Sequence, residues 1–282
     1  VQTPFLPKVI SSIDPWSLDN SQPAQLPLIG RAKAREAIIH QLENAIKGFG
    51  GILLVEGEAG IGKTRLMIEI ERDAQWHGIQ TFWGNNLEGR ASSPFGVISR
   101  ALSSGMTSLR INQLSQLIEE VWLSVLLPHI PQLSIEFPDL ASPPSLATSQ
   151  EYNRLVQAFA NLLTAWGKIT PLLLILEDLH WSNEDLINLL VALAPYLKAS
   201  RVIIIGTYRG EDAQIRSSLW EKISILGRVA TKQQICLERL TSNAAAELIR
   251  RSLRLSEAAP LFEKRLYRET QGNPLFILET LR

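Results

Sequence analysis

The sequence has a single cysteine, no excess of either charge and no long apolar run. One cysteine, Cys236, excludes a disulfide within the chain, and its neighbours Ile235 and Leu237 predict a packed strand thiol rather than a nucleophile. Because this cysteine usage is typical of a reducing compartment, we expect a cytoplasmic protein. Lys and Arg together number 28, and so do Asp and Glu, so no net positive field favours direct nucleic-acid binding. No stretch approaches the roughly 18 apolar residues of a membrane span or resembles a signal peptide, so we expect no membrane partner.

The two ends of the chain differ in composition from the middle. Residues 1–27 are rich in proline and small polar residues and have no sustained hydrophobic period, which predicts an interdomain arm or linker. The sequence begins at Val1 and reaches Arg282 within a helical pattern. We therefore expect a segment of a longer polypeptide.

Residues 57–64 have the pattern G-x-x-x-x-G-K-T. A strand-like apolar run, 51–56, precedes this pattern, and apolar residues at helical spacing follow it, so a strand–loop–helix unit is favoured over a plain glycine turn. Such a loop wraps an anion with its backbone N–H groups at the start of a helix. Its Lys is expected to reach the β- and γ-phosphates, and its Thr hydroxyl to bind Mg²⁺. The predicted nucleotide-binding residues are Gly57, Glu58, Ala59, Gly60, Ile61, Gly62, Lys63, Thr64 and Arg65.

A second apolar run, residues 172–176, ends in Glu177 and Asp178. Unbroken apolar sequence is typical of a parallel strand covered on both faces. Two acids at the carboxyl end of such a strand, in a chain with a phosphate loop, stand where Mg²⁺ and an attacking water need them; solvation of the strand end is the alternative. A further apolar run, 201–206, precedes Arg209, which is expected either to contact the γ-phosphate or to form a structural ion pair.

The remaining pattern predicts the fold. Strands are expected at 51–56, 79–83, 172–176, 201–206 and 233–237. A single helical stripe runs through 114–125, and residues 148–151 have the composition of a capping box that opens another helix. Consecutive helices replace the strand–helix alternation after residue 240. We predict an α/β P-loop NTPase fold, a three-layer sandwich with a mainly parallel five-stranded sheet over 28–240, followed by a small all-helical subdomain over 241–282, incomplete at its C-terminus.

With these residues in place, the chain resembles the STAND class of signal-transduction ATPases, a branch of the AAA+ P-loop proteins. The resemblance is strongest to the ATPase module of large LuxR-type and related bacterial regulators. The blocks Asp-Leu-His-Trp and Gly-Asn-Pro-Leu-Phe are more specific than the phosphate loop, which is generic. Five segments show the resemblance, in chain order: 28–31, 57–64, 174–181, 205–209 and 272–276.

The resemblance implies a role for each matching position. Gly30 and Arg31 would lie near the adenine and ribose, and Pro274 of the helical subdomain would pack against the adenine. Lys63 and Thr64 would hold phosphate and Mg²⁺, Glu177 would support Mg²⁺ through water, and Asp178 would complete the metal site and orient the attacking water. Arg209 would act as the first sensor, whereas His180 and Trp181 are expected to be structural.

One position departs from the family pattern. The first acid after the strand is often Asp in such proteins and is Glu177 here. Magnesium has a demanding coordination geometry, so the longer side chain is expected to reduce hydrolysis while sparing nucleotide binding.

The expected function is an ATP/ADP-binding switch with slow Mg²⁺-dependent hydrolysis, in which Lys63, Glu177, Asp178 and Arg209 are catalytic. Its partners would be effector and sensor domains outside this segment, with self-association in the ATP-bound state. A non-hydrolysing ADP-binding oligomerisation module and, less favoured, a DNA-handling AAA+ ATPase remain as alternatives. A small-molecule kinase is the weakest rival, because no acceptor site is visible in the sequence.

Overall fold

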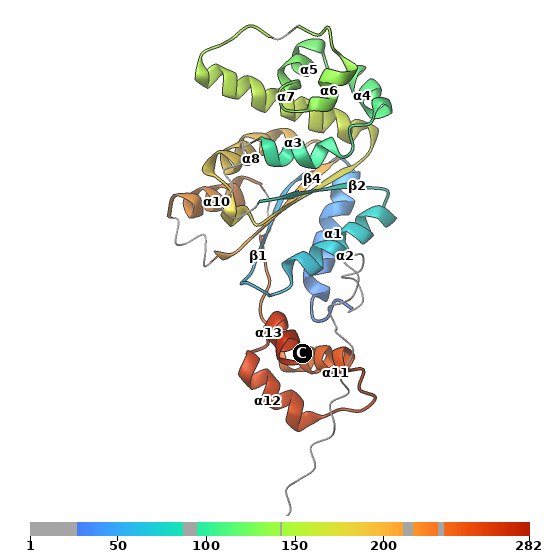
Figure 1. Ribbon diagram of the computed structural model, residues 1–282, viewed down its shortest axis with the longest axis vertical. Helices are drawn as coiled ribbons and strands as arrows, with labels where there is room; N and C mark the ends of the chain where they lie inside the picture. Colours follow the sequence, from blue (N-terminus) through green and yellow to red (C-terminus); the bar gives the residue numbers. More distant parts are fainter. Residues whose placement is uncertain (1–26, 87–94, 142, 211–216, 231–233) are drawn as a thin grey trace, which may run out of the picture. The chain divides into compact units, whose positions relative to one another are not determined.

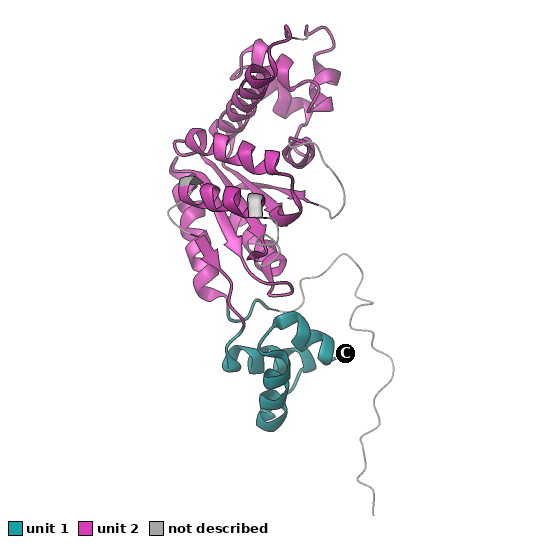
Figure 2. Cartoon of the chain, turned by 90° about the vertical axis from the view of Figure 1, so that its left-hand side faces the viewer, with its two compact units in different colours: residues 1–30, 240–282 teal, residues 31–239 magenta. Residues whose placement is uncertain are grey.

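The structure is a computed structural model that describes residues 27–86, 95–141, 143–210, 217–230 and 234–282 (Figure 1). The predicted arm lies outside the described residues except for Pro27. The chain forms two compact units: residues 31–239, and residues 240–282 together with 1–30 (Figure 2). Residues 28–30, which precede the first helix, therefore belong with the helical unit.

The larger unit contains one five-stranded sheet. Its strands are β1 (Gly51–Glu56), β2 (Gln80–Asn85), β3 (Leu172–Glu177), β4 (Val202–Tyr208) and β5 (Gln234–Cys236). Their order is β2-β3-β4-β1-β5, and every neighbouring pair is parallel. The predicted α/β class and parallel five-stranded sheet are confirmed. The last two apolar runs differ slightly in extent, since β4 continues through Tyr208 and the described part of β5 begins at Gln234.

Alternate strand residues point to opposite sides of the sheet. Both faces are apolar here, and helices cover both. The face that carries Ile52, Leu54 and Ile204 packs in one cluster with α7 (Thr148–Ile169) and α8 (Glu184–Leu197). The cluster also includes residues of α3 (Gly96–Ser103) and α10 (Ser217–Ala230). The opposite face is covered by α1 (Ala32–Ile46) and α2 (Lys63–Trp76) (Figure 1). These are the three layers of the predicted sandwich.

Two local predictions are wrong. The apolar stripe over 114–125 is not one helix but the end of α4 (Ser108–Ser115) and most of α5 (Glu120–Leu126), followed by α6 (Pro131–Glu136). The break falls at residues 116–119, where the extended Glu119 caps α5. The proposed capping box is also absent, because Thr148 is already helical and Ala147 is the N-cap, with no side-chain hydrogen bond.

The smaller unit contains α11 (Ser242–Leu253), α12 (Pro260–Thr270) and α13 (Pro274–Thr280). The Thr241 and Asn273 side chains accept hydrogen bonds from the first turns of α11 and α13, which satisfies N–H groups that a helix start leaves unpaired. The helices share a core that includes Ile29 and Leu240. Among the described residues, no helix is long and apolar enough to cross a membrane.

Candidate functional site

The phosphate loop, residues 57–64, connects β1 to α2 at the carboxyl edge of the sheet. Gly62 is the N-cap of α2 with φ 97°, a left-handed conformation that favours glycine. At Gly57 a Cβ atom would lie 2.7 Å from Ile61 Cγ2, so any other residue there would force the Ile61 side chain or the loop to shift. Lys63 is buried, and its ammonium donates to the carbonyl oxygens of Gly57 at 2.8 Å and Glu58 at 3.0 Å. The loop thus surrounds a positive charge at a helix N-terminus.

The loop contacts the acid at the end of β3, Glu177, across the intervening strand. Thr64 Oγ1 donates to Glu177 Oε1 at 2.6 Å. Because β4 lies between β1 and β3, this bond joins groups that are two strands apart in the sheet. The structure therefore brings together Thr64 and Glu177, two of the three predicted metal ligands.

Burial raises the pKa of Glu177 above its ordinary value, and the neighbouring Asp178 charge raises it further. The Thr64 hydrogen bond and the Lys63 charge oppose this shift. The ionised carboxylate is therefore held at a position that disfavours it in the absence of a cation. Such perturbed acids are typical of functional sites.

Asp178 leaves β3 in an unusual conformation. It has φ 54° and ψ 51°, the left-handed region that residues other than glycine rarely adopt. Its N–H donates to Thr207 Oγ1 at 3.1 Å. The preceding carbonyl, of Glu177, accepts from Asn86 Nδ2 at 2.8 Å. The sequence pattern did not indicate Asn86, and it included Thr207 only within the segment 205–209; their contacts with the 177–178 peptide could have been indicated only by their places at the ends of neighbouring strands.

Arg31 is hydrogen-bonded to the main chain of the phosphate loop. Its guanidinium donates to the carbonyl of Ile61 at 2.9 Å and to that of Glu238 at 2.5 Å. The side chain is buried, and this burial lowers its pKa. Arg31 thus ties the phosphate loop to the segment that follows β5.

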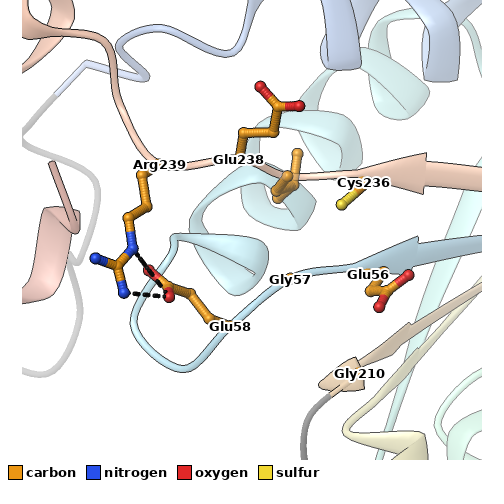
Figure 3. A pocket seen from close by; sticks show the side chains of 8 residues that line it. Glu56, Gly57, Glu58, Gly210, Cys236, Glu238 and Arg239 are labelled. Atoms are coloured by element: carbon orange, nitrogen blue, oxygen red, sulfur yellow. Dashed lines mark hydrogen bonds and ion pairs between the residues drawn. The ribbon is translucent and has the colours of Figure 1, made fainter. Parts of the chain in front are cut away.

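A pocket of about 260 Å³ lies beside the start of the loop. It is lined by Glu56, Gly57, Glu58, Gly210, Cys236, Leu237, Glu238 and Arg239 (Figure 3). Arg239 and Glu58 form a two-pronged ion pair, with the shortest contact at 2.8 Å. Cys236 is exposed, so the prediction of a packed thiol is wrong. Partial desolvation of the sulfur atom and the nearby Glu56 charge raise the pKa of the thiol, which disfavours a role as a nucleophile.

The other predicted site residues have clear places. Arg209 directly follows β4 at the same edge as the loop, and Arg65 pairs with Glu69 within α2 at 2.5 Å. Gly30, with φ 69°, and Pro274, the first residue of α13, both belong to the helical unit. His180 is buried, with its Nδ1 atom 3.8 Å from Asp178 Oδ1.

The oxygen atoms at the loop fit a nucleotide-bound magnesium ion. Mg²⁺ is usually held by one or two carboxylates together with substrate phosphates. Thr64 and Glu177 supply a hydroxyl and a carboxylate within 2.6 Å of each other. No group of three or more His, Cys, Asp or Glu residues is placed to hold a metal ion in the part of the chain that the structure describes.

Comparison with known families agrees with this geometry. The model of the AAA ATPase domain family matches residues 27–205, more than half of the chain. The chain belongs to the AAA ATPase domain family. No curated protein sequence is detectably similar to this AAA ATPase domain.

Solved structures with a similar fold include an Aeropyrum pernix ORC1 protein in complex with DNA, with 15% sequence identity and a TM-score of 0.52. That likeness covers 92% of this AAA ATPase domain chain and 61% of the ORC1 chain, so the chain spans less than two thirds of the ORC1 length. Two variants of Thermotoga maritima RuvB match 89% of this chain and 60% of their own, at 15% identity and TM-scores of 0.46 and 0.45. At this identity the ORC1 likeness indicates the fold alone.

Proposed function

We propose that this AAA ATPase domain binds ATP and ADP with Mg²⁺ and hydrolyses ATP slowly. The observation that carries the proposal is the 2.6 Å bond between Thr64 Oγ1 and Glu177 Oε1. A P-loop hydroxyl and an acid at the end of a neighbouring strand are the groups that hold the metal ion in P-loop NTPases. Their direct contact supports a shared site rather than a solvated strand end.

Each side chain has a defined part in this proposal. The Lys63 ammonium would exchange its two loop carbonyls for the β- and γ-phosphate oxygens. Thr64 and Glu177 would hold Mg²⁺, which neutralises charge on the phosphoryl oxygens when bound. Asp178 would complete this metal site and orient the attacking water, and Arg209, at the end of β4, would act on charge that develops at the γ-phosphate. Turnover is expected to be slow because Glu177 is one methylene longer than the Asp typical of this position.

We further propose that the domain is the nucleotide switch of a larger cytoplasmic signalling or transcription-regulating protein of the STAND class. This rests on the sequence resemblance, including the roles of Gly30, Arg31 and Pro274 near the adenine. ATP and ADP differ in their γ-phosphate contacts, and differential affinity for two conformations is what a switch requires. Effector and sensor domains, and self-association in the ATP-bound state, belong to the same proposal.

The decisive experiment identifies any nucleotide released from the purified, denatured protein and then follows single-turnover hydrolysis of radiolabelled ATP with Mg²⁺. We expect an adenine nucleotide and slow conversion of ATP to ADP and phosphate, with a strongly lowered but still measurable rate in Asp178→Ala. ATP that stays intact for hours, with no effect of Asp178→Ala, would favour a non-hydrolysing ADP-binding module. A protein that is empty and binds no ATP at saturating Mg²⁺ would overturn the proposal.

Binding of duplex DNA is measured in the same preparation. The balanced charge of the chain predicts none, and affinity that falls steeply with salt would favour a DNA-handling ATPase instead.

A further inference from the structure

The peptide group between Glu177 and Asp178 is hydrogen-bonded on both sides by neighbouring strand ends. Its carbonyl accepts from Asn86 Nδ2 at 2.8 Å and from the Asn86 main-chain N–H at 3.3 Å. Its N–H donates to Thr207 Oγ1 at 3.1 Å. Asn86 follows β2, Thr207 lies on β4, and β3 runs between them. Both side chains are buried, with 6% and 1% of their surface exposed.

This peptide group needs outside support. A left-handed conformation costs most residues other than glycine about 1–2 kcal/mol and Asp less than this, and Asp178 adopts one. Strained conformations of this kind persist only where the surroundings hold them. The turn is also fixed beyond Asp178, because Leu179 packs where a side chain on Gly206 of β4 would otherwise lie, 2.4 Å from the Leu179 Cδ1 atom.

The orientation of Asn86 follows from the same contact. Its Oδ1 atom is buried and has no hydrogen-bond partner among the described residues. The side chain is therefore oriented by the bond that its Nδ2 donates to the Glu177 carbonyl. The reversed amide would place two oxygen acceptors against each other and would remove the bond that Nδ2 now donates to the Glu177 carbonyl.

We propose that Asn86 and Thr207 are positioning residues for ATP hydrolysis, acting through the 177–178 peptide. This inference rests on the proposed ATPase function. The peptide plane sets the direction of both acids: Glu177, which meets Thr64, and Asp178, which orients the water in the proposed mechanism. Neither Asn86 nor Thr207 needs to touch the nucleotide. A displacement of about 1 Å at a reacting group can lower a rate about 100-fold, so loss of either bond lowers the rate of the chemical step more than nucleotide affinity.

The first test replaces Thr207 with Val, which keeps the shape and removes the hydroxyl acceptor, and with Ser, which keeps the hydroxyl. Single-turnover rates at saturating ATP are expected to fall about 10–100-fold in Thr207→Val and to recover to within about threefold of wild type in Thr207→Ser. ATP affinity is expected to stay within about twofold in both variants. Asn86→Leu, which removes the donor on the other side of the peptide, is expected to have the same effect and serves if Thr207→Val does not fold.

Two further measurements exclude a merely structural role. Combined with Asp178→Ala, Thr207→Val is expected to cause no additional loss of rate, because residues that act as one unit are not additive. Hydrogen exchange at the Asp178 amide in nucleotide-free protein is expected to be faster in Thr207→Val and near wild type in Thr207→Ser. A wild-type rate in folded Thr207→Val and Asn86→Leu, a loss confined to affinity, or an additive double variant would refute the inference.

Failure of the proposed function gives a different result. A wild-type protein that neither binds nor hydrolyses ATP refutes the ATPase proposal and with it a catalytic role for the pair. Amide exchange alone then tests whether the Asp178 N–H is held by the Thr207 hydroxyl. Equal protection of the Asp178 amide in wild type and Thr207→Val would show that Thr207 does not hold this peptide.

Discussion

Replacing Glu177 with Gln is expected to make the nucleotide-free protein more stable at neutral pH. The amide has nearly the same shape, and its oxygen still accepts the hydrogen bond that Thr64 donates to Glu177 at 2.6 Å. The substitution removes a charge whose pKa is raised by burial and by the nearby Asp178 charge. The folded protein therefore no longer holds an ionised carboxylate in an environment that disfavours it.

The pH dependence follows from the direction of the shift. A carboxylate with a raised folded-state pKa favours folding most below its unfolded-state pKa, and this contribution is lost as the pH rises through the folded-state pKa. Wild type and Glu177→Gln should therefore have similar stability in acid and diverge as the pH rises, with the variant more stable. Stabilising substitutions of this kind typically contribute about 1 kcal/mol, which corresponds to about 2–4 °C in the unfolding temperature of a domain this size.

The assay is thermal unfolding of both proteins without nucleotide across this pH range. Glu36→Gln, the same chemical change on an exposed glutamate of α1, is the control and should show no such divergence. An equal or lower unfolding temperature for Glu177→Gln at neutral pH, or a difference that does not grow with pH, would refute the reasoning. The same variant is expected to lose ATP hydrolysis, so greater stability with less activity would indicate a site kept for function.

Three further substitutions test the loop and its surroundings. Lys63→Ala is expected to weaken Mg-ADP binding about 10–100-fold in calorimetry, because a charge-assisted hydrogen bond contributes about 1.5–3 kcal/mol; unchanged affinity would contradict the assigned role. Gly57→Ala would place Cβ 2.7 Å from Ile61 Cγ2 and should lower stability by about 1–3 kcal/mol in urea unfolding. Arg239→Gln removes the ion pair with Glu58, in which the Arg239 side chain is 46% exposed, and should change stability by less than about 1 kcal/mol.

The sheet could be predicted because its strands are unbroken apolar runs. Leu172 to Leu176 and Val202 to Ile205 are buried, and such unbroken apolar sequence is typical of a parallel strand covered by helices on both faces. The helices of residues 108–136 were harder to predict from the sequence, because the apolar positions keep one helical period across the break between α4 and α5. One helix ends at Ser115 and the extended Glu119 is the N-cap of the next, and hydrophobic periodicity alone does not reveal that change.

The site divides in a similar way. Glycine spacing and the paired acids are local patterns, so the loop and Glu177 could be located from the sequence. The contacts that orient them come from residues far away in the chain: Asn86 is 91 residues from Glu177, and Thr207 is 29 residues from Asp178. Asparagine and threonine are common at strand ends for many reasons, so the sequence does not single out these two. Their hydrogen-bond partners can be identified only when the order of the strands in the sheet is known.

The last prediction concerns Gly206, which lies on β4 between the loop and the acids. A Cβ atom there would be 2.4 Å from Leu179 Cδ1 and 3.2 Å from Leu54 Cδ2, so Leu179 would have to move. Because Asp178 directly precedes Leu179, Gly206→Ala is expected to displace the turn that carries Asp178, costing about 1–3 kcal/mol of stability and slowing ATP hydrolysis more than it weakens ATP binding. Gly227→Ala in α10 is the matched control: its new methyl group has no neighbour closer than 3.8 Å, and it should keep or raise stability. Equal behaviour of the two variants would mean that close packing of Leu179 on β4 does not set the geometry of this site.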